Sequence, residues 1–187
     1  GALYSNTTGY YNTANGRNAL YFNTTGYNNT ANGLVALYSN TTGDANTAMG
    51  QSALNKNTEG HGNTAIGNQA LENNITGNFN SAIGVAALFN TTTGSTNTAH
   101  GHLALLTNTT GQGNTALGYF ADVTTSNLTN ATAIGNNAKV NASNKIQLGN
   151  TSVTSVATSG ALTTGDVTYP NTTGTPGQVL TINANDT

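Results

Sequence analysis

Small apolar residues recur along this chain at fixed places within a repeated polar unit. Residues 12–16 read NTANG, and the same pattern starts again at 29, 46, 63, 80, 97 and 114, always at the same interval (29 − 12 = 17; 114 − 97 = 17). Residues 131–135 keep the register with Ala131 in place of asparagine. The unit reads N-T-A-x-G-x-x-A-L-x-x-N-T-T-G-x-x, and its positions are numbered 1 to 17 from Asn12. Such strict register predicts stacked structural units, although a composition this polar otherwise suggests disorder.

The unit is too short for the helical repeats, which run to about 33–47 residues, and for leucine-rich repeats of about 20–29. It carries glycine at positions 5 and 15 and several Asn and Thr residues, all of which are weak helix formers. Short strands broken by Gly and Asn turns suit this composition. We therefore predict an all-β fold, a parallel β-solenoid with 17-residue coils, in which each coil pairs with the next at about 4.8 Å.

Stacking of coils turns each repeat position into a column of like residues. We expect the alanines of position 3 and the leucines of position 9 to line the interior, and the glycines of positions 5 and 15 to supply special backbone angles at corners. Asparagine columns at the turns are expected to hydrogen-bond between coils. The alanine column is Ala14, Ala31, Ala48, Ala65, Ala82, Ala99, Ala116 and Ala133, and the leucine column is Leu3, Leu20, Leu37, Leu54, Leu71, Leu88 and Leu105.

Position 4 forms a mostly apolar column with polar interruptions. One coil holds few apolar groups, so its burial offers little against the cost of ordering its residues. An interface between chains would add the missing burial, and polar residues in such a seam fix its register. We therefore predict a homotrimer with this seam at its centre. The column is Asn15, Asn32, Met49, Ile66, Ile83, His100, Leu117 and Ile134.

Three of the units carry a resemblance to a known family. Residues 63–67 (NTAIG), 80–84 (NSAIG) and 131–135 (ATAIG) resemble the NSVAIG-type motif of YadA-like trimeric autotransporter heads. The last step, from Gly135 to Gly149, is shorter than the others (149 − 135 = 14) and is similar to the coil length of that family. The resemblance covers roughly residues 1–150 and implies a left-handed parallel β-roll, a homotrimer and adhesion to host or surface ligands. The 17-residue coils, and NTA where the motif has SVA, depart from the family.

The chain divides into a repetitive part and a tail. Residues 1–150 are predicted to form the β-roll or solenoid, as a shaft or head. Residues 151–187 are rich in Thr and Gly and unrepetitive, and we interpret them as a β neck or linker similar to linkers of phage-type tail fibres. Ala2 and Leu3 occupy positions 8 and 9 of a preceding unit, so we expect the sequence to be a piece of a longer protein.

Composition and charge exclude several functions. Charged residues make up 5% of the chain, against roughly 25% in ordinary soluble proteins. With a net charge of −2 and four scattered basic residues, we expect no nucleic-acid binding. No stretch approaches the roughly 18 apolar residues of a membrane span, so we expect no membrane insertion by this segment. Without cysteine there is neither a disulfide framework nor a thiolate metal site.

The ionisable residues suggest no catalytic centre. The acids are interpreted as solvated turn residues, and none form the carboxylate pair of a glycoside hydrolase, so we expect neither enzyme activity nor a cofactor. His100 and His102 are expected to alternate along one strand and share a face, with His61 in a turn. Three copies of His100 around an axis could bind a metal, but a polar seam residue without metal is the preferred interpretation. The acids are Asp44, Glu59, Glu72, Asp122, Asp166 and Asp186.

Tyrosine gathers in the first three units and offers a candidate partner-binding site. Tyr10, Tyr11 and Tyr27 stand at variable turn positions and could form an exposed platform for a glycan or another partner. The second set is interpreted as a stacked ladder, because its members lie one repeat apart; it consists of Tyr4, Tyr21 and Tyr38. The repeat also creates glycosylation sequons, among them Asn6, Asn23, Asn40, Asn108 and Asn141.

These observations favour a non-catalytic structural protein, a fibre or adhesin segment that attaches to a host or surface. It would work outside the cell, at the cell surface or in a virion tail fibre, with further copies of itself and an unidentified receptor or glycan as partners. Phage-type fibre and bacterial adhesin both remain open. The alternative is a β-solenoid ice-binding protein that uses the threonine column of position 2: Thr13, Thr30, Thr47, Thr64, Thr98, Thr115 and Thr132.

Overall fold

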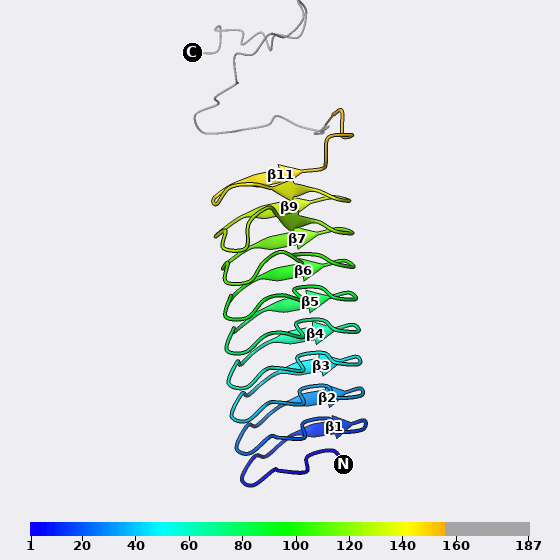
Figure 1. Cartoon of the computed structure of the whole chain (residues 1–187), viewed down its shortest axis with the longest axis vertical. Helices are drawn as coiled ribbons and strands as arrows, with labels where there is room; N and C mark the ends of the chain where they lie inside the picture. The colour runs from blue at the N-terminus through cyan, green and yellow to red at the C-terminus, as the bar shows by residue number, and fades with distance from the viewer. Residues whose placement is uncertain (156–187) are drawn as a thin grey trace, which may run out of the picture. The chain divides into compact units, whose positions relative to one another are not determined.

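The computed structural model describes residues 1–155, and within them the chain winds into a parallel β-solenoid (Figure 1). Residues Gly1–Thr154 form one compact unit. The neck or linker predicted at residues 151–187 lies, from residue 156 onward, outside the described residues. No helix occurs among residues 1–155. The all-β, parallel-solenoid fold class predicted from the repeat is therefore confirmed.

Nine short strands form one parallel sheet in the order β1-β2-β3-β4-β5-β6-β7-β9-β11. A second, two-stranded sheet pairs β8 with β10. The strands of the large sheet are β1 (Thr13–Asn15), β2 (Thr30–Asn32), β3 (Thr47–Met49), β4 (Thr64–Ile66), β5 (Ser81–Ile83), β6 (Thr98–His100), β7 (Thr115–Leu117), β9 (Thr132–Ile134) and β11 (Ile146–Leu148), and the small sheet has β8 (Asp122–Val123) and β10 (Lys139–Val140).

The register of the sheet reproduces the sequence period. Thr13 pairs with Thr30 and Ala14 with Ala31, partners that lie one full repeat apart (30 − 13 = 17). The final pairing joins Thr132 to Ile146 across a shorter step (146 − 132 = 14). The shorter closing coil expected from Gly135 and Gly149 is thus present. Backbone hydrogen bonds continue outside the strands, for example from Leu20 N–H to the Ala36 carbonyl at 3.0 Å, so successive coils are joined around most of their circumference.

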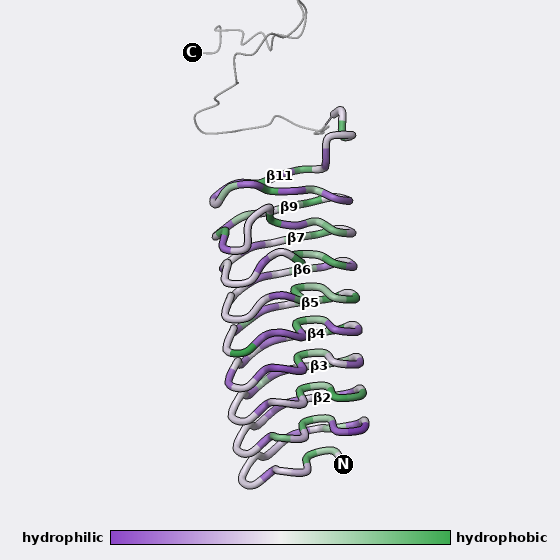
Figure 2. Tube along the Cα trace, viewed as in Figure 1, coloured by the Kyte–Doolittle hydropathy of each residue, from purple (hydrophilic) through white to green (hydrophobic). Residues whose placement is uncertain are grey.

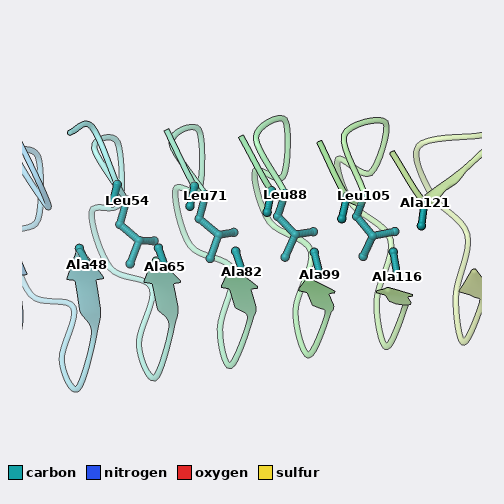
Figure 3. Packing of buried hydrophobic residues seen from close by; sticks show 14 of the residues in the cluster. Ala48, Leu54, Ala65, Leu71, Ala82, Leu88, Ala99, Leu105, Ala116 and Ala121 are labelled. Carbon is teal, nitrogen blue, oxygen red and sulfur yellow. The ribbon is translucent and has the colours of Figure 1, made fainter. Parts of the chain in front are cut away.

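The interior consists of alanine and leucine columns. From the second coil onward, the alanines of positions 3 and 8 and the leucines of position 9 are fully buried. In Figure 3, each labelled leucine points across the coil toward an alanine on a strand. Figure 2 shows how the hydropathy pattern repeats from coil to coil. Small alanines let the two sides of a coil approach closely, and one leucine per coil fills the remaining space.

The leucines of position 9 fill the interior with their side chains, and their backbone also forms tight corners of the coil. Their backbone lies in the left-handed region, with φ of 50° at Leu20 and 52° at Leu71 and Leu105. Positions 7 and 17 adopt the same conformation, as at Asn18 and Asn28. This conformation costs a non-glycine residue roughly 1–2 kcal/mol. Burial of the leucine side chain, at about 1.5–3 kcal/mol, offsets that cost, which explains why a bulky residue can occupy a tight corner.

One buried asparagine column, at position 12, runs through the interior. Its side-chain amides form a continuous chain: Asn40 Nδ2 donates to Asn23 Oδ1, and Asn57 Nδ2 to Asn40 Oδ1, both at 2.8 Å. Each amide also donates to the position 15 glycine of its own coil, as Asn40 does to the Gly43 carbonyl at 2.9 Å. A Cβ atom at Gly43 would collide with the Gly60 carbonyl and the Asn40 side chain. Glycine is therefore needed there for close approach.

A second buried asparagine column stands at position 1, just before each strand. Asn46 donates its Nδ2 to the Gly60 carbonyl at 2.8 Å, and its Oδ1 accepts the backbone N–H of Asn63 at 2.9 Å. The expected hydrogen bonding of asparagines between coils is confirmed. Both columns lie inside the solenoid and not on its surface, because each amide satisfies backbone groups that would otherwise be buried without partners.

The leucine column ends at Asp122, and here the prediction of a solvated turn acid is wrong. Asp122 is fully buried. Its carboxylate accepts hydrogen bonds from the Thr107 hydroxyl at 2.7 Å and the Val123 N–H at 2.9 Å. It also pairs at 3.5 Å with Lys139, which occupies the same repeat position one coil later (139 − 122 = 17) and lies 3.4 Å above the Phe120 ring centroid. These partners compensate the buried charge.

The asparagine ladder of position 12 has one interruption that yields a test. Thr91 stands where other coils have asparagine, and Asn74 Oδ1 consequently has no hydrogen-bond partner. We predict that Thr91→Asn raises the free energy of unfolding by about 1 kcal/mol, because the new amide donates to this buried oxygen. Denaturant unfolding followed by circular dichroism measures the change.

The matched control for this test is Asn57→Thr, which opens the same gap in an intact part of the ladder. It should lower the free energy of unfolding by roughly 1–3 kcal/mol. A Thr91→Asn protein no more stable than the parent would contradict the role assigned to the ladder.

The left-handed corner at position 17 yields a second test. Thr96 is exposed and β-branched, and its φ is 58°, whereas Asn28 and Asn130 occupy the equivalent position in other coils. Because asparagine tolerates this region, Thr96→Asn should stabilise the fold by about 1 kcal/mol. Thr93→Asn, an exposed site in the same coil without positive φ, should leave the unfolding midpoint unchanged. Equal effects at both sites would refute the backbone explanation.

Candidate interaction surfaces

The outer face of the large sheet carries two straight columns, at positions 2 and 4. Since side chains alternate along a strand, the buried alanine of position 3 turns both neighbours outward. Ile66 is 37% exposed and Leu117 48% exposed. The strand register aligns Ile66 with Ile83 and Ile83 with His100. The apolar column predicted as a seam thus lies on the surface of the single chain.

The threonines of position 2 differ from those of position 13. Thr24 and Thr41 at position 13 donate their hydroxyls to carbonyls of the next coil at 2.9 and 3.0 Å. By contrast, no hydroxyl of position 2 hydrogen-bonds to another described residue. The hydroxyls of position 13 therefore stabilise the solenoid itself. Those of position 2 form a regular array that is free to contact a molecule on the outer face of the sheet.

The histidines do not share one strand. His100 ends β6 and is exposed on the outer sheet face, whereas Gly101, with φ of 142°, turns the chain before His102. His102 stacks instead on Tyr119 at a centroid distance of 5.5 Å. The prediction that both histidines alternate along one strand is therefore wrong. His61 lies in the loop between β3 and β4, and within the described residues no three acidic or histidine side chains are grouped as a metal site would require.

The three tyrosines singled out as a candidate binding site come together at one edge of the solenoid. Tyr10 stacks on Tyr27 with ring centroids 5.0 Å apart and planes inclined by 6°. Tyr11 meets Tyr10 edge-on, also at 5.0 Å, with planes inclined by 77°. Tyr10 is 52% exposed and Tyr11 81% exposed. The result is an open aromatic corner with two ring orientations.

Asp44, which the sequence pattern indicates only as a turn acid, extends this corner by one coil. It follows Tyr27 at position 16 (44 − 27 = 17). Its carboxylate stabilises the protonated Tyr27 phenol by hydrogen-bond attraction and repels the phenolate, and both effects raise the pKa of Tyr27 above its usual value. His61 occupies the next position 16 and packs edge-on against Phe79 at 5.0 Å. The shared spacing of one repeat was the available signal for this grouping.

The other tyrosines form the predicted ladder. Tyr4 stacks on Tyr21 at 5.0 Å with planes inclined by 7°, and Tyr21 stacks on Tyr38 at 5.5 Å. Phe22 packs edge-on against Tyr21 and Tyr38. The three tyrosine rings lie at position 10 and Phe22 at position 11, in different columns from the aromatic corner. The ladder interpretation is confirmed, and it supplies tyrosines of matched type for comparison with Tyr10 and Tyr11.

The repeat sequons are mostly unsuited to glycosylation. Asn23, Asn40 and Asn108 are fully buried members of the position 12 column, where their amides are already hydrogen-bonded. Attachment of a glycan would remove those bonds and force a bulky group into the interior. Asn6 is half-buried, and Asn141 is exposed. Of these five sites, only Asn141 offers a fully accessible amide.

Comparison with protein-family models and with curated proteins finds no match for this chain. The described residues contain no helix of the length and apolarity that a membrane span requires.

The contact between Tyr27 and Asp44 makes a specific prediction. Replacing Asp44 by Asn removes the charge that opposes the phenolate, so the pKa of Tyr27 should fall toward its ordinary value. An alkaline absorbance titration of the protein's eight tyrosines should show one phenol ionising at lower pH than in the parent. Glu59→Gln removes an exposed acid elsewhere and should give the parent's curve. An unchanged curve for Asp44→Asn would show that the two side chains do not interact.

Proposed function

We propose that this chain is a non-catalytic segment of a trimeric fibre or adhesin that attaches to a host or surface outside the cell. The observation that carries the proposal is the outer sheet face, where the position 4 column leaves Met49, Ile66, Leu117 and Ile134 between 37% and 48% exposed in the single chain. Apolar side chains aligned in this way on one face mark an interaction surface.

Three copies packed about this face would bury the column along the shaft. Its polar members, Asn15, Asn32 and His100, would then stand at defined heights and fix the axial register of the chains, as polar residues do in coiled-coil seams. A second copy is a suitable partner because every copy has the same column at the same spacing. The low charge of the chain, 5% of residues, adds little repulsion between copies.

The resemblance of residues 63–67, 80–84 and 131–135 to YadA-like heads supports the same assembly and, with it, a left-handed sense of the coil. The buried ladders support a mechanical role, since each coil is tied to its neighbours by backbone and amide hydrogen bonds. Such a shaft suits both versions of the proposal, a phage-type tail fibre and a bacterial surface adhesin. Both use a rigid rod to hold a binding surface at a distance from its base.

Light scattering on a gel-filtration column tests the assembly. The proposal predicts a mass near three times the chain mass of 18.9 kDa. Replacing both Ile66 and Ile83 by Asn, the residue present at this position in Asn15 and Asn32, should shift the protein toward the monomer. Val85→Asn combined with Leu34→Asn alters exposed apolar residues of position 6 and should leave the trimer intact. A parent protein that runs as a monomer would contradict the proposal.

Ice binding is a second candidate, and the unbonded hydroxyls of position 2 favour it. Thr30, Thr47 and Thr64 lie side by side in the sheet, and a regular threonine array of this kind can order water. The two candidates exclude each other, because a trimer seam at position 4 would cover the adjacent threonines. A measurement of thermal hysteresis on the purified chain distinguishes them: hysteresis by a monomer supports ice binding, and its absence excludes it.

A further inference from the structure

Positions 16 and 17 form a rigid edge of the solenoid, next to the entrance of each strand. In the first coils this edge carries Tyr10, Tyr11, Tyr27 and Asp44, here called the tyrosine edge. The Tyr10 carbonyl accepts the Asn28 N–H at 3.1 Å, and the Tyr27 carbonyl accepts the Ala45 N–H at 3.0 Å. The turns that bear these side chains are thus fixed to one another, so the edge is preorganised for a ligand.

Neither packing nor backbone preference accounts for Tyr11. It is 81% exposed, so its ring contributes little to the core. Its φ of 56° lies in the left-handed region, where bulky residues are disfavoured. Two other coils place Asn28 and Gly62 at the same position, and those residues adopt this conformation more easily; a second exposed aromatic residue, Phe79 with φ of 55°, occupies it in a further coil, where it packs against His61. An exposed aromatic side chain held at a backbone cost is characteristic of a binding site.

The chemistry of the tyrosine edge selects the class of ligand. The open face of Tyr11 suits a flat apolar surface, and the phenols of Tyr10 and Tyr27 add polar tips beside it. Asp44 follows Tyr27 at position 16 of the next coil, and its carboxylate has two oxygens that can accept hydrogen bonds from hydroxyl donors. Its negative charge disfavours anionic ligands. The ligand should therefore combine an apolar face with several hydroxyl groups and carry no negative charge.

We propose that the tyrosine edge is a binding site for neutral pyranose saccharides, with the C–H face of a sugar ring on Tyr11 and sugar hydroxyls donating to Asp44. The site would supply the attachment step of the proposed fibre, and in that sense it rests on the proposed function. All of its residues come from one chain, however, so its binding does not require the trimer. Attachment and assembly can therefore be tested separately.

The test is a glycan array probed with the fluorescently labelled chain. The array carries neutral hexose and N-acetylhexosamine oligosaccharides together with sialylated and sulfated ones. We expect binding to neutral glycans, and a loss of about tenfold or more with Tyr11→Asn or Tyr10→Gln, as for hot-spot aromatics at other interfaces. Both substitutions use residues found at the equivalent positions of other coils, Asn28 and Gln112, so the coil geometry is retained.

Tyr4→Asn is the matched control. Tyr4 is 72% exposed, a value between those of Tyr10 and Tyr11, but it belongs to the position 10 ladder, and Asn55 stands at that position in another coil. Its substitution should leave the array signal unchanged. The proposal is overturned by a parent protein that binds no neutral glycan, by binding confined to acidic glycans, or by equal losses with Tyr4→Asn and Tyr11→Asn. Equal binding by the Tyr11→Asn variant and the parent would also refute it.

Light scattering on the same samples separates this site from the fibre. A trimer that binds no neutral glycan refutes the tyrosine edge and leaves the proposed assembly standing. A monomer that binds neutral glycans through Tyr11 supports the site and refutes the trimer.

Discussion

The stacking of the coils depends on buried asparagine amides that bond from one coil to the next. Asn23, Asn40 and Asn57 pass hydrogen bonds along the axis at 2.8 Å. In the position 1 column, each side-chain Oδ1 accepts the backbone N–H of the asparagine one coil later. An asparagine amide carries both a hydrogen-bond donor and an acceptor. It can therefore donate to the asparagine of one neighbouring coil and accept from that of the other, and each added coil extends the chain of bonds. Alanine and leucine fill the remaining space. A polar chain can thus form an ordered interior with few apolar residues.

This arrangement separates the residues that build the coil from those that face the surroundings. Positions 1, 3, 8, 9, 12 and 15 point inward or sit at close approaches and are nearly constant along the sequence. Positions 4, 6, 10, 16 and 17 vary and are exposed or half-buried in most coils. A substitution at one of these exposed positions changes the surface of a single coil and leaves the fold of that coil intact. The tyrosine edge and the position 4 column both arise from variation at such exposed positions.

Much of the fold could be predicted from the sequence because a strict period determines parallel register and column identity. The period does not give backbone angles, so the left-handed leucines of position 9 were not foreseen. The period also does not predict whether a side chain is buried where the repeat departs from its consensus. Asp122 is buried because Lys139 and Thr107 compensate its charge. At the candidate site, Tyr10, Tyr11 and Tyr27 could be selected as turn tyrosines. The contribution of Asp44 could not be predicted, because the sequence does not show which position 16 side chains interact with one another.

The central claim is that the asparagine amides lie inside the solenoid and carry its hydrogen bonding from coil to coil. Hydrogen exchange of side-chain amides, followed by NMR on the ¹⁵N-labelled protein, tests it most directly. The Nδ2 protons of Asn40, Asn46 and Asn57 should exchange as slowly as the backbone amides of the leucine column, while those of Asn28 and Asn127, which are exposed and lie outside the position 4 column, should exchange at rates close to those of free amides. Rapid exchange at Asn40, Asn46 and Asn57 would contradict the account, because those amides would then be open to water.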